Sequence, residues 1–154
     1  MNLLAELQTL LDAFRTEKID YALCGGFALA AYGIVRATED IDLLVPENDL
    51  PQISEMLSRL SYVRERSPLV FQAGRLIMHR FVKTQPGSEE FVLVDLLLVG
   101  ELTAEAWKSR RRGTSASGEF VVVSLRGLIN LKRLRNSGQD LDDIRQLEAL
   151  PDEN

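Results

Sequence analysis

The spacing of apolar and polar residues switches between the helical and the strand period along the chain. Leucines and a phenylalanine recur every three or four residues over 2–17, which predicts an amphipathic helix with one buried face. A short apolar run at 19–24 predicts a strand. An alanine- and leucine-rich segment at 27–32 follows two glycines and predicts a short helix. A second strand is expected over 41–45, where Pro46 stops it.

The rest of the chain continues this mixture of helices and strands. We expect, in order, a helix over 50–60, strands at 62–64, 69–71, 76–82 and 91–99, a helix over 101–112, a loop at 113–118, a strand at 120–123, and closing helices over 125–135 and 140–150 around a turn at 136–138. Asn48 and Asp140 are the expected helix caps. The mixed order predicts an α+β fold in which helices flank a mixed sheet.

Composition narrows the class of protein. A chain of 154 residues is one domain long, so residues 1–154 are expected to form a single domain. The formal charge of −5 argues against broad, salt-driven binding to nucleic acid, although it leaves room for a local basic patch. Cys24 is the only cysteine, so no internal disulfide can form. With no signal peptide and no apolar run of about 20 residues, we expect a cytoplasmic protein without a membrane segment.

Two carboxylates stand out where the second strand begins. Side chains on a strand alternate between its faces, so Asp40 and Asp42 share one face while Ile41 points to the core. Asp95 lies inside the most apolar run of the chain, where a lone carboxylate is costly unless it has a partner. If the strand that carries Asp95 lies beside the strand of Asp40 and Asp42, the three carboxylates converge.

Three converging carboxylates repel one another. At 4 Å each pair costs about 1–4 kcal/mol, for dielectrics between water and a protein surface. The cluster is tolerable if the carboxylates share a proton or if a divalent cation sits among them. Ligands that are all oxygen suit Mg²⁺ or Mn²⁺. Magnesium favours partners with phosphate oxygens, which points to a nucleotide.

Gly25 and Gly26 separate a strand from a helix. Backbone N–H groups at such a helix start can face a phosphate, and glycine lets the phosphate come close. A plain tight turn explains the same two glycines, so this feature alone is weak.

Together these residues resemble the DNA polymerase beta-type nucleotidyltransferase superfamily. The similarity rests on Gly25-Gly26, the pair Asp40 and Asp42, and Asp95 on a later apolar strand. It is closest to small prokaryotic members, the minimal nucleotidyltransferases and the abortive-infection type toxins of toxin–antitoxin systems. The form common in those proteins also includes the residues Gly33, Arg36 and Thr38, and closing helices like 124–132 with the later Asp140 and Asp143.

The resemblance implies a nucleotidyltransferase-like mixed β-sheet and a reaction that uses two metal ions. A nucleoside monophosphate would pass from a nucleoside triphosphate to a hydroxyl group. Asp40 and Asp42 would hold both metals, and Asp95 would bind the metal that activates the hydroxyl. The residues implied for the nucleotide are Gly25, Gly26, Arg36, Thr38 and Lys132. Phe27 stands where some members carry a serine.

Several of these residues have a second explanation. Lys132 is as well explained by a solvated helix charge as by a phosphate contact. Arg36 contacts the nucleotide or pairs with Glu39, and Glu39 points away from the aspartates if the strand is regular. The basic cluster of Lys108 and the run 110–112 faces an RNA acceptor or, in the favoured interpretation, ends a helix in solvent.

Two functions follow from the sequence. The first is a Mg²⁺-dependent nucleotidyltransferase whose acceptor is an RNA, a protein or a small molecule, with an antitoxin partner if the toxin subtype holds. The second is a catalytically silent nucleotide- or partner-binding module with the same fold. The lone histidine, His79, shares a strand face with Ile77 and Phe81 and is expected in the core.

Overall fold

The fold is built around a single twisted β-sheet. The computed structural model describes residues 1–136 and 138–151. Within them an eight-stranded sheet runs in the order β3-β5-β6-β2-β1-β8-β7, and β4 pairs with the start of β5. The strands are β1 (Ala22–Cys24), β2 (Asp40–Pro46), β3 (Val63–Arg64), β4 (Leu69–Phe71), β5 (Leu76–Thr84), β6 (Phe91–Val99), β7 (Arg111–Ser115) and β8 (Gly118–Val122).

The sheet is mixed, as the sequence predicts. Strand β2 runs parallel to β6, and β1 runs parallel to β8. The pairs β1–β2, β5–β6 and β7–β8 are antiparallel. The parallel β2–β6 pair joins segments far apart in the chain, and it decides which side chains meet at the centre of the sheet.

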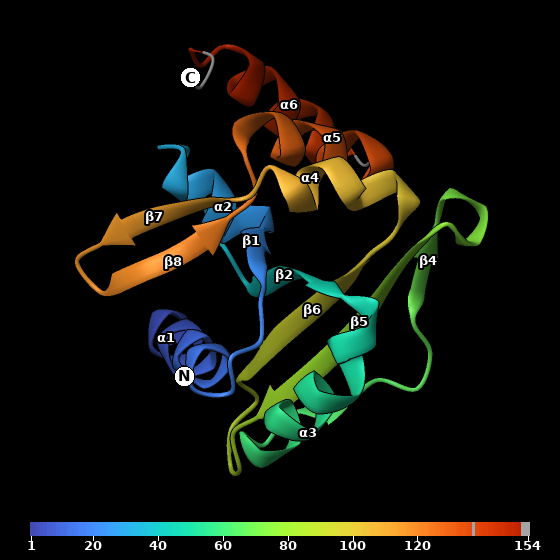
Figure 1. The fold of residues 1–154 in the computed structure, drawn as a ribbon. Coiled ribbons are helices and arrows are strands. Elements are labelled where there is room, and N and C mark those ends of the chain that lie inside the picture. The colour runs from blue at the N-terminus through green and yellow to red at the C-terminus, as the bar shows by residue number, and fades with distance from the viewer. Residues whose placement is uncertain (137, 152–154) are drawn as a thin grey trace.

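Helices cover the sheet on two sides (Figure 1). They are α1 (Leu3–Thr16), α2 (Gly25–Ala31), α3 (Leu50–Arg59), α4 (Ala104–Lys108), α5 (Leu125–Arg135) and α6 (Gly138–Glu148), with short 3₁₀ turns at Glu47–Asp49, Gln72–Gly74 and Glu101–Thr103. In the view of Figure 1, α4, α5 and α6 gather above the sheet, while α1 and α3 lie below it. None of the described helices is long and apolar enough to cross a membrane.

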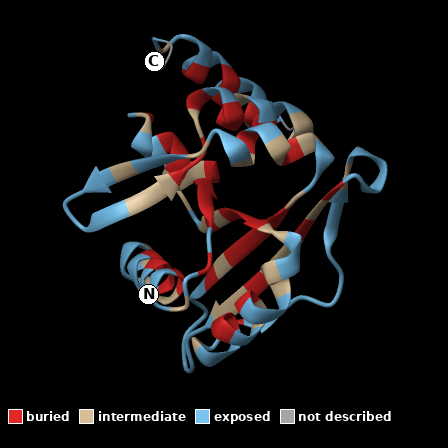
Figure 2. Cartoon of the chain, in the orientation of Figure 1, coloured by how far each residue is buried: buried red, intermediate tan, exposed pale blue. Residues whose placement is uncertain are grey.

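One part of the core lies between the lower helices and the central strands, and a second part packs α5 and α6 onto the other side of the sheet through residues such as Leu128 and Leu147 (Figure 2). Burial concentrates on the middle of the sheet. Ile41 and Leu43 of β2 are fully buried, as expected for positions that alternate with Asp40 and Asp42. Helix α1 buries the stripe that its leucine spacing predicts, namely Leu7, Leu10, Leu11 and Phe14. The carboxylates of β2 therefore point away from this first part of the core.

The helix predicted over 101–112 is confirmed only as far as Lys108, and the loop predicted over 113–118 is wrong. Helix α4 ends at Lys108, and the chain then forms a hairpin from β7 and β8. A Cβ at Gly113 would lie 2.5 Å from Cζ of Phe120, so glycine lets the two strands of the hairpin close over that ring. Gly118, with φ of +118°, begins the return strand. The arginine run favours a helix locally, but cross-strand pairing overrides that preference.

Both predicted helix caps are also wrong. A 3₁₀ turn takes up Asn48, so α3 begins at Leu50 with Pro51 in its first turn. Helix α6 begins at Gly138, which places Asp140 inside its first turn. Ser137 of the predicted turn lies outside the described residues. The observed side-chain caps are Asn2 on α1 and Ser124 on α5.

Candidate metal and nucleotide site

Four side chains form a row across four neighbouring strands. Cys24 of β1 pairs with Asp42 of β2, Asp42 pairs with Asp95 of β6, and Asp95 pairs with Arg80 of β5. Directly paired residues project from the same face of a sheet. Cys24 is a buried free thiol whose pKa is raised by that burial and by Asp42, so it stays protonated. The polar end of the row therefore consists of two carboxylates and one guanidinium.

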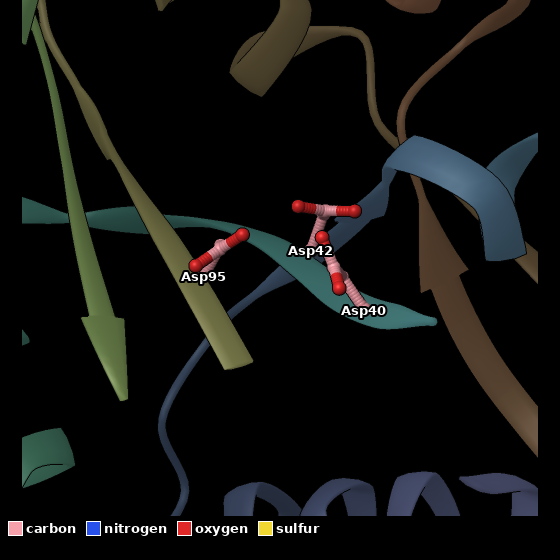
Figure 3. A group of neighbouring side chains, drawn as sticks. All are labelled: Asp40, Asp42 and Asp95. Atoms are coloured by element: carbon pink, nitrogen blue, oxygen red, sulfur yellow. The ribbon is translucent and has the colours of Figure 1, made fainter. Parts of the chain in front are cut away.

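Asp40 completes a cluster of three carboxylates (Figure 3). Asp40 and Asp42 of β2 project from the same side of the sheet as Asp95 of the neighbouring β6. One oxygen from each of the three lies within 4.8 Å of the others. Such oxygens are close enough to share one small cation. The strand pairing that the sequence argument required is thus present.

The cluster favours protonated carboxyl groups when no cation is bound. Burial, and then the charge of Asp95, raise the pKa of Asp42 to about 7. The pKa of Asp40 is raised by the same two causes, with Arg80 opposing the rise. Asp95 is only 1% exposed. Two carboxyl groups with raised pKa values lie beside a third carboxylate, so a cation bound here would stabilise their ionised forms.

Arg80 supplies one positive charge to this site. Its Nε donates to Oδ1 of Asp95 at 2.8 Å, and its second nitrogen donates to Oδ2 at 2.9 Å. The same guanidinium lies 3.9 Å from Asp40. The hydrogen bonds to Asp95 raise the pKa of Arg80 still further, so the arginine stays charged. Arg80 holds the buried Asp95 in a bidentate ion pair.

The two glycines allow a close approach between α2 and the strand β2. Gly25 has φ of +68°, and a Cβ there would lie 2.1 Å from Oδ2 of Asp42. A Cβ at Gly26 would lie 2.6 Å from Oγ1 of Thr38. The helix therefore starts directly against the carboxylate cluster. This packing gives the glycines a structural reason, and their contact with phosphate stays a prediction.

A cavity of about 360 Å³ opens beside the carboxylates. It is lined by Gly26, Arg36, Ala37, Thr38, Glu39, Asp40 and Asp42. Most of the residues predicted to hold a nucleotide therefore border one hollow next to the predicted metal ligands. Glu39 is exposed and lies outside the cluster of three, in keeping with the alternation of the strand.

Lys132 and Arg36 are held by carboxylates of α6. Nζ of Lys132 lies 3.2 Å from Asp143 and 3.5 Å from Asp140. Arg36 donates to Asp143 at 2.8 Å, and its Nε is buried with no hydrogen-bond partner among the described residues. Asp143 therefore ties the loop before β2 to α5 and α6. Lys132 is therefore not a solvated helix charge, and Arg36 pairs with Asp143 and not with Glu39.

Lys132 also lies beside the carboxylates. A small cavity of about 20 Å³, enough for one water, separates the row on the sheet from α5 and is lined by Asp42, Asp95, Lys132 and Arg135 among others. Arg135 partly opposes the rise in the pKa of Asp42. The last turn of α5 thus adds positive potential above the acidic row.

Sequence reasoning missed Arg80 and Arg135, and it gave Asp143 no role at the site. A signal for Arg80 was present, because Arg80 is a charged residue at the middle of a predicted strand, as Asp95 is. Because Arg80 and Asp95 carry opposite charges, the two strands that hold them are favoured as neighbours in the sheet. Arg135 carries no such signal, because a basic last turn is ordinary for a helix.

Other singled-out residues lie away from the cluster. His79 is half-buried rather than in the core, and its Nδ1 lies 2.9 Å from a guanidinium nitrogen of Arg64. Burial and this neighbour lower the pKa of His79. The arginines of the basic cluster follow α4 instead of ending it, and Arg110 stacks 3.9 Å above the ring of Trp107. A contact with an RNA acceptor stays the untested alternative for this cluster.

The fold matches solved nucleotidyltransferase structures. An ANT(2″)-Ia complex with adenylyl-2″-tobramycin aligns with a TM-score of 0.65 and 14% identity, covering 93% of this chain and 86% of the other. The lincomycin-bound lincosamide adenylyltransferase LnuA aligns with a TM-score of 0.61 and 17% identity, covering 96% and 97%. A nucleotidyltransferase-like protein from Paracoccidioides brasiliensis aligns with a TM-score of 0.55 and 18% identity, covering 94% and 74%. Because the sequence identities are only 14–18%, these structural matches show the fold alone.

The sequence of this chain shows the family to which it belongs. Residues 1–118 match the family described as "Uncharacterised nucleotidyltransferase", and the chain belongs to it. A comparison with curated proteins found no match. The superfamily resemblance, the α+β fold and the enzyme class predicted from the sequence are confirmed. The toxin subtype stays a prediction.

Proposed function

We propose that this protein transfers a nucleoside monophosphate from a nucleoside triphosphate to a hydroxyl group, at a divalent metal site formed by Asp40, Asp42 and Asp95. The observation that carries this proposal is the convergence of the three carboxylates within 4.8 Å in a chain of a nucleotidyltransferase family. A protein that only needed a scaffold gains nothing from concentrating these charges, because they repel one another.

The donor set fits Mg²⁺ or Mn²⁺. All three groups offer carboxylate oxygens, which these ions prefer. Burial, and then the charge of Asp95, raise the pKa of Asp42, and a bound cation would favour its ionised form. When bound, such an ion stabilises negative charge that develops on phosphoryl oxygens. Asp40 and Asp42 are placed to hold it next to the cavity, and Asp95 lies on its inner side.

The nucleotide is proposed to lie in the cavity beside Asp40 and Asp42. Gly26, Arg36 and Thr38 line this cavity, and Gly25 begins α2 immediately next to it. The guanidinium of Arg36 is partly exposed there, with Asp143 fixing one end of the side chain. Lys132 is buried and pairs with two carboxylates, so we assign it an indirect role through its positive potential.

A small-molecule hydroxyl is the acceptor we favour, with ATP as donor. The solved relatives include an adenylyltransferase bound to lincomycin and an enzyme bound to adenylyl-2″-tobramycin. The hydroxyl of an RNA or a protein is the other outcome of the test. The whole chain, residues 1–154, is proposed to act as one domain.

Transfer of label from an α-labelled triphosphate tests the activity. Each of the four triphosphates is incubated with Mg²⁺ and a cell extract, and the products are separated into small molecules, RNA and protein. We expect label from ATP in the small-molecule fraction, and none with Asp42→Asn. Labelled RNA or protein would change the acceptor class. No labelled product from any triphosphate would contradict the transferase activity.

One observation favours the silent binding module as a second candidate. Three cations that surround the site are already engaged, with Arg80 on Asp95 and with Lys132 and Arg36 on α6. A module that only senses nucleotide would be stabilised thermally by a triphosphate without turning it over. A melting-temperature shift with nucleotide, together with an absence of labelled product, would favour this module.

The toxin role, the antitoxin partner and the cytoplasmic location stay predictions. They are tested in cells by expressing this chain alone and together with any small regulator encoded beside it. Growth arrest that the neighbour relieves, and that Asp42→Asn abolishes, would support the toxin role.

A further inference from the structure

The ion pair between Arg80 and Asp95 occupies the innermost carboxylate of the proposed metal site. Both oxygens of Asp95 accept hydrogen bonds from Arg80, at 2.8 and 2.9 Å. A guanidinium held in this way places a full positive charge beside the oxygens that a divalent cation would need. Two cations at such a distance repel, so the arginine and a metal ion compete for Asp95.

The position of Arg80 is built into the sheet. Arg80 is the direct strand partner of Asp95, which in turn is the direct partner of Asp42. The guanidinium also approaches Asp40 to 3.9 Å, so it bridges two of the three carboxylates. The side chain of Arg80 is 31% exposed, whereas that of Asp95 is 1% exposed. Arg80 therefore reaches the buried carboxylate from the solvent side, so its side chain can swing out into solvent when the ion pair breaks.

The other cations near the cluster are held elsewhere. Lys132 pairs with Asp140 and Asp143, and Arg135 lies 5.9 Å from the ring of Phe71. Among the ion pairs of the described residues, Arg80 is thus the cation that pairs directly with carboxylates of the cluster, namely Asp95 and Asp40. Without it, the buried Asp95 would face two like charges and lose its bidentate hydrogen-bond partner.

We propose that Arg80 is the built-in counter-ion of the three-carboxylate site, and that a divalent cation binds there in exchange for its ion pair with Asp95. The inference rests on the proposed metal site. Its consequence is that Arg80 stabilises the protein before metal binds and lowers the affinity of the site for metal. Arg80 is a positioning residue in this scheme, because it acts through Asp95.

Metal binding without nucleotide tests the exchange. Isothermal titration of the full chain with Mn²⁺ at about pH 8 compares wild type with Arg80→Met, which keeps an unbranched apolar stem and removes the guanidinium and its charge. We expect R80M to bind Mn²⁺ about tenfold more tightly or better, and to melt at a lower temperature when metal is absent. Equal or weaker binding by R80M would overturn the inference.

A matched control separates this effect from a general loss of positive charge. Arg75 lies just before the same strand and pairs with the exposed Glu101 at 3.6 Å, away from the cluster. Arg75→Met should leave both Mn²⁺ affinity and melting temperature close to wild type. The double variant Arg80→Met/Asp95→Asn should recover part of the metal-free melting temperature, because it removes the unpaired buried charge together with its partner.

The wild-type protein gives an independent readout by nuclear magnetic resonance. The Nε–H resonance of Arg80, assigned from its loss in Arg80→Lys, should shift on titration with Mg²⁺ and exchange faster with solvent once its bond to Asp95 is broken. A resonance that stays unchanged while Mg²⁺ binds would refute the exchange, even if R80M fails to fold. If neither protein binds metal, the metal site and the proposed function fail together; if both bind equally, only the role of Arg80 fails.

Discussion

Asp42 and Asp95 stand directly opposite each other on the parallel strands β2 and β6. Two carboxylates in this relationship share one face of the sheet, and Asp95 is the second cause, after burial, of the raised pKa of Asp42. Their juxtaposition is unfavourable in the metal-free protein and becomes favourable when a cation is shared.

Asp42→Asn should abolish metal binding and stabilise the metal-free protein. The substitution removes one of three repelling charges at about pH 8, and about 1 kcal/mol of relief corresponds to a rise of about 2–4 °C in melting temperature for a chain of this size. Scanning fluorimetry with and without Mg²⁺ or Mn²⁺ measures both effects. We expect a higher baseline melting temperature and no shift with metal.

Glu39→Gln is the matched control for Asp42→Asn. Glu39 is an exposed acid next to the cluster but outside it. E39Q should keep the metal-dependent shift of the wild type. A shift that persists in D42N, or disappears in E39Q, would mean that the wrong carboxylates have been assigned.

Metal affinity should depend on pH through Asp42. The ordinary pKa of this carboxyl is 3.8, and burial in the fold raises it to about 7. Between these values the folded protein holds a proton that the unfolded chain has lost, so metal-free stability falls as pH rises through this window. Metal must displace the proton, so affinity should rise about tenfold per pH unit up to about pH 7 and then level off. Titration calorimetry from about pH 5.5 to pH 8 measures this slope, and a flat profile would show that Asp42 is already ionised.

Gly25→Ala should destabilise the protein and distort the carboxylate cluster. The new Cβ would lie 2.1 Å from Asp42, at a residue with φ of +68°. Strain and clash together should cost about 2–4 kcal/mol. Gly33→Ala is the control, because Gly33 also has a positive φ but open space around its Cβ. Urea unfolding should show a loss of about 1 kcal/mol for G33A; an equal loss in both variants would argue that Asp42 does not restrict Gly25.

Asp143→Asn should weaken both the fold and nucleotide binding. The substitution removes the buried carboxylate that Lys132 and Arg36 share, while Lys132 keeps Asp140 and Arg36 stays partly exposed, so the loss should be about 1–3 kcal/mol. Asp142→Asn, at an exposed neighbour on the same helix, should cost less than about 0.5 kcal/mol. Chemical denaturation and the thermal shift with ATP compare the two variants. If D143N unfolds like D142N, the network on α6 does not hold the loop before β2.

The sequence by itself determined the local elements and the face of each carboxylate. The period of two over 41–45 places Ile41 in the core and Asp40 and Asp42 on the other side, and the structure agrees. The apolar run around Asp95 indicated a central strand in the same way. These predictions succeed because they depend only on burial of neighbouring side chains. The helix expected over 101–112 ends early, at Lys108, because the pairing of β7 with β8 outweighs local preference.

Only the tertiary structure decided which side chains meet. The period of a strand fixes its faces but not its neighbours, so the sequence could state the convergence of Asp95 with Asp42 only as a condition. Arg80 joins the same row because β5 pairs with β6 in one particular register. Asp143 reaches Arg36 because α6 packs beside the loop before β2. Each of these contacts joins distant parts of the chain and is set by the packing of whole elements, which no local pattern of residues contains.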